Sequence, residues 1–306
     1  MFESSYLLDP GSHTLRLYDP KTKTILQKRA CRLEKEPDII AEDALKASWS
    51  SNEKIVWPFM KEAIEADPAP LLKALFAKAP AERFLLVPNA SVLSFQAPSE
   101  ELSLHWQNLL EPYKLGRIKM APAFVPEGNK AFFRIHAGNS LVHFVMGMDG
   151  RVLGYKPLAI AGLAVDQAIS AEIARVFKVL ISAEDACALK ESVSNALKDG
   201  RDPVLQVTGL NQHNQFEQLR FRASDLWGAM EPVLQAIALQ AAEFVCSKGV
   251  ELMEQVLANP VILTGGLANC YGFASLLQKQ LHARVRIPEN PDTILLETAA
   301  KARRPF

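Results

Sequence analysis

The chain has 306 residues, of which 49% are hydrophobic and 22% are charged, which is typical of a globular protein and excludes a disordered one. Thirty-four basic residues balance thirty-four acidic ones, so the chain has no global attraction to nucleic acid or anionic lipid. Four scattered cysteines without a C-x-x-C pair predict reduced, buried thiols, not disulfides or a zinc site.

The first predicted unit is a three-stranded meander in the segment YLLDPGSHTLRLYDPKTKTILQK. An apolar strand leads into a turn at Gly11-Ser12, an alternating strand carries Leu15 and Leu17, and a third short strand runs from Thr24 to Leu26. Residues 28–54 are polar and mixed. A helix containing Leu71, Leu72, Leu75 and Phe76 and a short strand over residues 83–87 are expected next.

A second meander repeats the first one further along the chain, in FFRIHAGNSLVHFVMGMDGRVLGY. The turn glycines, Gly11 and Gly138, are 127 positions apart, and so are Ile25 and Val152 in the third strands. Two meanders can look alike by chance, since glycine turns between strands are common. The alternative is a two-lobed protein with a ligand between the lobes, in which backbone N–H groups of each turn face an anion such as phosphate.

The second half of the chain reads mainly as helices. Ile169, Ile173, Val176 and Phe177 are predicted to share one helix face. Ser182 is expected to cap the next helix, which stops at Gly200, and the strands VLQVTGL and QLRFRA follow it as a pair. A long helix from residue 224 should be kinked or divided at Pro232, because proline lacks the backbone donor.

A strand, a two-glycine turn and a helix are predicted in VILTGGLANCYGFASLLQKQL. Such a turn presents backbone N–H groups and the positive end of a helix to an anion, although it also fits a plain strand-to-helix connection. A strand in ARVRIP and a helix in PDTILLETAAKAR end the pattern. The alternation of strands and helices indicates a mixed α/β protein with two related lobes.

Four segments in this order resemble the actin, sugar-kinase and Hsp70-type ATPases, and within them the MreB bacterial actins. DPGSHTLRLYD resembles the first phosphate loop, and residues 40–76 resemble the stretch before an MreB helix. HAGNSLVHFV with IAGLAVDQAI resembles the second phosphate loop and the helix that follows it. ILTGGLANC resembles the turn that binds adenosine. The resemblance implies an actin-like α/β fold of duplicated mixed-sheet domains with flanking helices and two small inserted subdomains.

The resemblance also implies domain boundaries and a candidate nucleotide site. Subdomain IA takes 1–27, 55–126 and 286–306; IB takes 28–54; IIA takes 127–180 and 224–285; and IIB takes 181–223. The candidate nucleotide-binding residues are Asp9, Gly11, Ser12, His13, Arg134, Gly138, Asn139, Ser140, Gly162, Cys187, Lys190, Gly265, Gly266 and Leu267. No catalytic residue is assigned.

Several positions depart from what the resembled family carries. Asp9 keeps the acid near the metal, but Arg134 is assigned to the second acidic position, and only one glycine remains in the second turn. Cys187 stands where a glutamate would meet the ribose, and Phe95 or Gln96 stands where a glutamate would position water. The resemblance implies ATP as a possible ligand, whereas these departures make Mg²⁺ chemistry doubtful and leave Asp9 as a weak metal ligand.

Arg134 is hypothesised to take the electrostatic role of the metal, either by pairing with Asp9 or by contacting phosphate directly. It can also simply point to solvent. His136 and His143 lie on or beside one turn without a third ligand, which does not favour a metal or catalytic role.

The resemblance implies a cytoskeletal protein that forms protofilaments and organises cell shape or the cell wall, with weak or absent ATP hydrolysis. A non-polymerising adaptor that binds a cell-shape or division partner and a small-molecule kinase are the alternatives. We expect a cytoplasmic protein with peripheral membrane contact at most, because no apolar run approaches the roughly 18 residues of a membrane span and the start lacks signal-peptide features. No nucleic-acid partner is expected.

Overall fold

The chain forms two compact units, seen in a computed structural model. Unit 1 comprises Met1–Val125 and Thr293–Phe306, and unit 2 comprises Pro126–Asp292. The residues that the structure describes are 5–19, 22–51, 53–77, 89–95, 100–113, 115–124 and 130–302. The strand predicted over residues 83–87 lies outside them.

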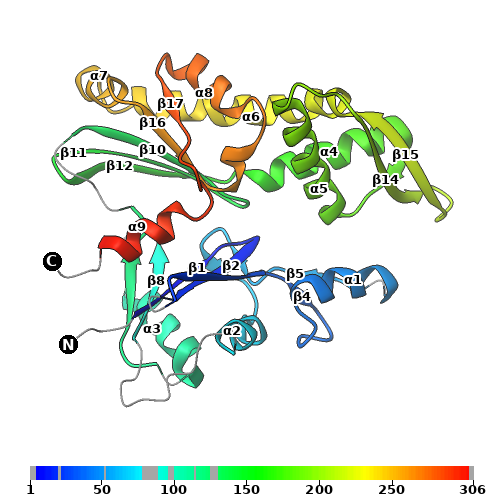
Figure 1. Ribbon diagram of the computed structural model, residues 1–306, viewed down its shortest axis with the longest axis horizontal. Coiled ribbons are helices and arrows are strands. Elements are labelled where there is room, and N and C mark those ends of the chain that lie inside the picture. Colours follow the sequence, from blue (N-terminus) through cyan, green and yellow to red (C-terminus); the bar gives the residue numbers. More distant parts are fainter. Residues whose placement is uncertain are drawn as a thin grey trace. The chain divides into compact units, whose positions relative to one another are not determined.

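A five-stranded mixed sheet forms the centre of unit 1 (Figure 1), in the order β3-β2-β1-β8-β9. The first three strands pair antiparallel as the predicted meander, and β1, β8 and β9 run parallel. The strands are β1 (Ser5–Pro10), β2 (Thr14–Asp19), β3 (Thr24–Arg29), β8 (Asn89–Ser94) and β9 (Ile118–Pro122). In β2 the alternating leucines Leu15 and Leu17 are fully buried, as period-2 patterning predicts.

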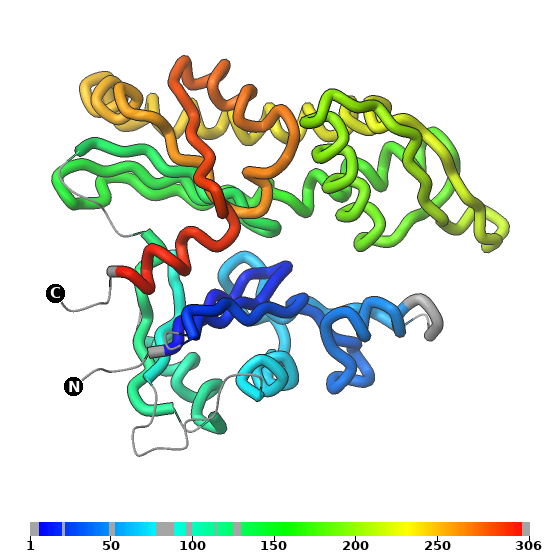
Figure 2. Tube along the Cα trace, viewed as in Figure 1, coloured from blue at the N-terminus to red at the C-terminus, as the bar shows by residue number. Residues whose placement is uncertain are grey.

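Helices and short strands complete unit 1. The helices are α1 (Ala41–Ser51), α2 (Ala69–Phe76), α3 (Glu100–Leu110) and α9 (Ile294–Ala302), with a 3₁₀ turn at Glu111–Tyr113. The short strands are β4 (Arg32–Leu33), β5 (Ile55–Val56), β6 (Phe59–Met60) and β7 (Ala63–Ile64). Helix α2 buries Leu75. In Figure 2 the red C-terminal α9 returns to the blue N-terminal strands, and its Leu296 packs with Leu7 of β1.

Unit 2 repeats the sheet of unit 1, in the order β12-β11-β10-β16-β17. Three antiparallel strands are again followed by parallel pairing from β10 to β16 and β17. These strands are β10 (Phe132–Ala137), β11 (Val142–Met148), β12 (Arg151–Leu158), β16 (Val261–Thr264) and β17 (Val285–Arg286). The predicted internal repeat is therefore confirmed as two sheets with the same connectivity.

The helices of unit 2 cover its sheet and carry a second, smaller sheet (Figure 1). They are α4 (Gly162–Phe177), α5 (Ala183–Lys198), α6 (Ala223–Cys246), α7 (Val250–Leu257) and α8 (Phe273–Leu281), with a 3₁₀ turn at Gly266–Asn269. The smaller sheet has the order β13-β14-β15, with strands β13 (Val179–Leu180), β14 (Val204–Asn211) and β15 (Phe216–Arg222). Ser182 caps α5 as predicted, since its Oγ accepts a hydrogen bond from the Asp185 amide at 2.9 Å.

Helix α6 is continuous through Pro232, so the predicted division is wrong and the predicted kink stays a prediction. Packing of the apolar face stabilises the helix on both sides of the missing hydrogen bond. In α4, Ile169 and Ile173 are buried, but Val176 is 48% exposed near the helix end. The boundary expected at residue 286 falls within β17, a strand of unit 2. The division into four subdomains stays a prediction.

Among the described residues, none of the helices combines the length with the apolar character that a membrane span needs.

Candidate functional site

The first candidate phosphate turn, residues 11–13, joins β1 to β2 in unit 1. A Cβ on Gly11 would lie 2.5 Å from the carbonyl oxygen of Thr14, so a side chain here would collide with the backbone of the turn. The same hypothetical Cβ would lie 3.9 Å from Nη1 of Arg16. The Arg16 guanidinium is therefore positioned beside the turn.

Asp9 and Arg16 face each other across the β1–β2 hairpin. Their carboxylate Oδ2 and guanidinium Nη1 are 3.6 Å apart, and the side chains are only 21% and 15% exposed. Burial raises the pKa of Asp9, and the neighbouring Arg16 offsets part of that shift. Asp9 thus has a cationic partner from its own hairpin.

His13 is held within unit 1 by three further side chains. Its ring stacks on Trp57, with centroids 6.0 Å apart and planes 9° from parallel. Arg29 Nη1 donates to the His13 ring at 2.8 Å, and the Thr14 hydroxyl lies 3.2 Å from Nδ1. These contacts fix the side chain of the turn.

The second candidate turn, with Gly138, Asn139 and Ser140, joins β10 to β11 in unit 2. The start of α4 is attached to it, since the amides of Gly162 and Leu163 donate to the carbonyls of Gly138 and Asn139 at 3.1 and 2.8 Å. A Cβ on Gly162 would lie 3.2 Å from the Gly138 carbonyl oxygen. Glycine at 162 therefore permits this close approach.

The two-glycine turn after β16 meets the same region of unit 2. Gly265 has a φ of +90°, and a Cβ there would lie 2.3 Å from the Ala137 carbonyl oxygen, one residue before Gly138. Gly266 is exposed, and a Cβ there would have no neighbouring atom within 4 Å. Leu267 is buried in the core. The structure thus brings together Gly138, Gly162 and Gly265, which are far apart in the sequence.

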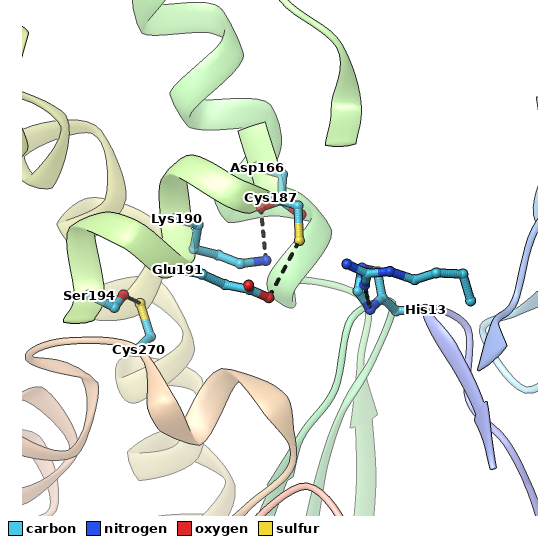
Figure 3. Close-up of polar contacts among 8 residues, drawn as sticks. His13, Asp166, Cys187, Lys190, Glu191, Ser194 and Cys270 are labelled. Atoms are coloured by element: carbon cyan, nitrogen blue, oxygen red, sulfur yellow. Dashed lines mark hydrogen bonds and ion pairs between the residues drawn. The ribbon is translucent and has the colours of Figure 1, made fainter. Parts of the chain in front are cut away.

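Lys190 of α5 forms a buried ion pair with Asp166 of α4 (Figure 3). Lys190 Nζ and Asp166 Oδ1 are 2.8 Å apart, and the side chains are 12% and 6% exposed. Burial opposes the charged form of Lys190, but the Asp166 carboxylate, together with Cys187 and Cys270, offsets this and raises the pKa of Lys190. The pair links the two helices that follow the second turn.

Two buried thiols lie in the same part of unit 2 (Figure 3). Cys187 Sγ is 4.0 Å from Glu191 Oε1, and Ser194 of α5 donates to Cys270 Sγ at 3.4 Å. Burial raises the pKa of Cys187 to about 11. Cys31 is also buried, but Cys246 is exposed, so the expectation of buried thiols is wrong for one of the four.

The strand register identifies the counterpart of Asp9 in unit 2. The pair Asp9–Arg16 of the first hairpin corresponds to the pair His136–His143 of the second, at the same 127-residue offset as the turn glycines. The register therefore favours His136 over Arg134 for this position. The Arg134 guanidinium lies over the Phe132 ring, 5.2 Å from its centroid, near the start of β10.

His136 and His143 belong to a polar row across the unit 2 sheet. His136 Nδ1 is 3.1 Å from the Thr264 hydroxyl, and His143 Nδ1 is 3.0 Å from the Tyr155 hydroxyl. The two imidazole centroids are 6.0 Å apart. Burial, followed by the charge of His136, lowers the pKa of His143 to about 2, so His143 stays neutral in the folded protein.

The described residues do not fit a resident divalent cation at the first turn. Mg²⁺ prefers carboxylate and other oxygen ligands in octahedral geometry. Asp9 already faces Arg16, and no group of three or more His, Cys, Asp or Glu residues is placed to hold a metal ion in the described part of the chain. The assignment of Asp9 as a metal ligand stays a prediction, and its ion pair argues against it.

The predicted pair of Asp9 with Arg134 involves residues of different units, so it stays a prediction. No water-positioning glutamate is identified either. Phe95 makes an edge-to-face contact with Phe124, Gln96 lies outside the described residues, and Glu100 and Glu101 are exposed in the first turn of α3.

Sequence reasoning missed Arg16 and Asp166, although each had a detectable signal. The length of the first turn sets the register of the hairpin, and in that register Arg16 is the residue opposite Asp9. Asp166 lies on the same helical face as Ile169 and Ile173, and a charge on an apolar face requires a partner. Trp57 had no such signal, because its contact with His13 depends on tertiary packing.

Comparisons with known proteins agree with this architecture. A family model described as MreB/Mbl protein matches residues 132–305. The cell shape-determining protein Mbl of Bacillus subtilis (strain 168) is 25% identical over 170 residues, and that of Bacillus cereus (strain ATCC 10987 / NRS 248) is 27% identical over 175 residues. Each match covers 55% of this chain and 50% of the relative, so the chain spans about half the length of the curated relatives it matches.

Solved structures show the same fold at low sequence identity. MreB5 of Spiroplasma citri bound to AMPPNP has a TM-score of 0.87 and 13% identity, covering 99% of this chain and 96% of that one. A MamK double helical filament has a TM-score of 0.73 and 14% identity, covering 99% of both chains. With an actin-like α/β fold and a family match over more than half of its length, this chain belongs to the MreB/Mbl protein family.

Proposed function

We propose that this protein is an actin-like cytoskeletal protein that assembles into filaments and serves cell shape or cell-wall organisation. Membership of the MreB/Mbl family supports the cytoskeletal role, and a MamK neighbour of the same fold is a double helical filament. Two Mbl relatives are cell shape-determining proteins. Longitudinal contacts are proposed to involve residues 28–54 and 181–223.

We also propose that it binds an adenine nucleotide with weak or absent hydrolysis. The observation that carries this is the convergence of Gly138, Gly162 and Gly265 in unit 2, where the close packing of glycine backbone brings the start of α4 and the turn after β16 to the second candidate turn. Glycine turns at the start of a helix are suited to binding phosphate. MreB5 of Spiroplasma citri has been solved with AMPPNP and with ADP. The ion pair at Asp9 and the single glycine of the second turn favour binding over metal-assisted hydrolysis.

Assembly is tested by sedimentation and negative-stain microscopy of the protein at increasing concentration, with ATP, with ADP and without nucleotide. Filaments that pellet support the proposal. A protein that stays monomeric at all salt and nucleotide conditions contradicts it and favours the adaptor function, which a stable complex with a cell-shape or division protein would then support.

Nucleotide binding is tested by calorimetry with ATP and ADP and by thermal unfolding. A ligand that binds only the native state raises the melting temperature, by an amount set by its concentration relative to Kd. Release of phosphate is measured in parallel. Binding without phosphate release supports a pseudo-ATPase, and unchanged melting at millimolar ATP contradicts nucleotide binding.

The adaptor function remains the second candidate because the small sheet of unit 2 has an exposed apolar row. Leu180, Leu210 and Phe216 are consecutive cross-strand partners in β13, β14 and β15. Leu180 and Phe216 are each 69% exposed. Such a row favours contact with another protein surface, either a second copy or a different partner.

A further inference from the structure

The β1–β2 hairpin places a fixed cation at the first phosphate turn. Asp9 and Arg16 are directly opposite each other in the antiparallel register, so backbone pairing and not a chance rotamer brings the side chains together. The guanidinium Nη1 lies 3.6 Å from the Asp9 carboxylate, and Arg16 is 15% exposed. The ion pair is therefore part of the hairpin.

The same guanidinium also reaches the turn itself. A Cβ built on Gly11 would lie 3.9 Å from Arg16 Nη1, so this end of the side chain is next to the backbone of the turn. Arginine presents several donors in a planar fork. Such a fork can contact two anionic groups at once, and charge-assisted contacts to phosphate are of this kind.

The two positions of unit 2 that correspond to Asp9 and Arg16 carry no acidic side chain that could serve as a metal ligand. His136 and His143 take the positions of Asp9 and Arg16, and His143 is buried with its Nδ1 at the Tyr155 hydroxyl. The described residues contain no cluster of three metal-ligating side chains. The positive charge beside the first turn is therefore that of the Arg16 side chain and not that of a bound metal ion.

We propose that Arg16 is a built-in counter-cation that stands beside Asp9 in place of a divalent metal, so that this protein binds nucleotide phosphate without Mg²⁺. The inference rests on the proposed nucleotide binding, and it goes beyond it by naming the residue that replaces the metal. A divalent cation at the same place meets electrostatic repulsion from the guanidinium and finds the Asp9 carboxylate already paired.

The first test compares the wild-type protein with Arg16→Met and a matched control. The control, Lys23→Asn, removes one positive charge from the exposed β2–β3 turn at a residue with φ of +57°, where asparagine is tolerated. Mn²⁺ binding is measured by electron paramagnetic resonance in the presence of ADP, whose phosphate oxygens supply the further ligands that Asp9 alone does not. Arg16→Met should acquire a Mn²⁺ site that the wild type and the control lack; equal binding by all three overturns the proposal.

The second test measures ADP affinity with Mg²⁺ and with EDTA. In the wild type, we expect the two affinities to agree within about twofold, and in Arg16→Met the affinity in EDTA should fall about tenfold or more. A tenfold loss of wild-type affinity in EDTA, which corresponds to about 1.4 kcal/mol of binding free energy, overturns the proposal. If the wild type binds no ADP under either condition, the proposed nucleotide binding fails; if it binds ADP with Mg²⁺ and not with EDTA, only the role of Arg16 fails.

A second variant covers the case in which Arg16→Met does not fold. Asp9→Asn removes the carboxylate that holds Arg16, so the guanidinium is released toward phosphate. ADP affinity in EDTA should rise at least about threefold. If Asp9 instead serves a metal, Asp9→Asn weakens ADP binding in Mg²⁺, and that result overturns the proposal.

Discussion

At the scale of single residues, charge and burial determine what each candidate group can do. His143, Asp166 and Lys190 are all buried or nearly so, and burial disfavours an uncompensated charge. Lys190 keeps its charge because Asp166 is 2.8 Å away. His143 has a tyrosine hydroxyl and a second imidazole beside it, so it stays neutral.

The neutral His143 predicts a specific pH dependence of stability. Its pKa is about 2 when folded and 6.5 in its unperturbed form, so the unfolded chain binds more protons between these values and stability falls as pH is lowered below 6.5. Well below pH 6.5 the loss approaches about 1.4 kcal/mol per pH unit. Urea unfolding at several pH values should show that His143→Phe is less acid-sensitive than the wild type.

The matched control is His213→Phe, at an exposed position of the β14–β15 turn. This variant should keep the wild-type slope of stability against pH. If His143→Phe and His213→Phe show the same slope of stability against pH, the buried His143 imidazole is not the cause of the acid sensitivity.

The Asp166–Lys190 pair predicts that a single substitution lowers the free energy of unfolding much more than substitution of both residues does. Lys190→Met leaves a buried carboxylate without its cation and should cost about 3–5 kcal/mol of unfolding free energy. Adding Asp166→Asn removes that charge and should recover most of the loss. Chemical denaturation measures both, and a double variant less stable than Lys190→Met contradicts the role of the pair.

At the scale of elements, the glycine turns position the candidate site. The turn after β16 passes so close to Ala137 that a side chain on Gly265 has no room, while Gly266 next to it faces open space. The order of the five strands explains this contact, because β16 is hydrogen-bonded parallel to β10. Parallel neighbours end at the same edge of a sheet.

Two neighbouring alanine substitutions test this packing. Gly265→Ala meets both a φ of +90° and a clash at 2.3 Å, and should lower the unfolding free energy by more than about 2 kcal/mol. Gly266→Ala should change it by less than about 0.5 kcal/mol. Thermal and urea unfolding provide the comparison, and equal effects at the two positions would show that close packing is not what requires glycine at 265.

At the scale of the whole molecule, the proposed assembly requires surfaces that each unit can present to another copy. The apolar row of Leu180, Leu210 and Phe216 is the feature of unit 2 that most resembles a protein contact. Val250 of α7 is also highly exposed, at 66%, but it is not part of this row. A comparison of these positions separates a specific contact from general surface hydrophobicity.

Phe216→Ser should therefore reduce the pelleted fraction in sedimentation, with loss of filaments in micrographs, because it removes an exposed aromatic anchor. Val250→Ser is the control and should assemble as the wild type does. Circular dichroism checks that both variants are folded. If Phe216→Ser pellets as well as the wild type, the row is not an assembly contact, and pull-down with a partner becomes the relevant measurement.

The sequence alone determined the repeated meander, the helix patterns and the Ser182 cap, because each follows from local alternation, helical periodicity or turn chemistry. Glycines 11, 138 and 265 were recognised for the same reason. Only the tertiary structure decided that Asp9 faces Arg16, that His136 takes the equivalent place in unit 2, and that Lys190 pairs with Asp166. Strand register and helix packing decide these contacts, so the signals at Arg16 and Asp166 identify a partner only once the strands and helices are placed.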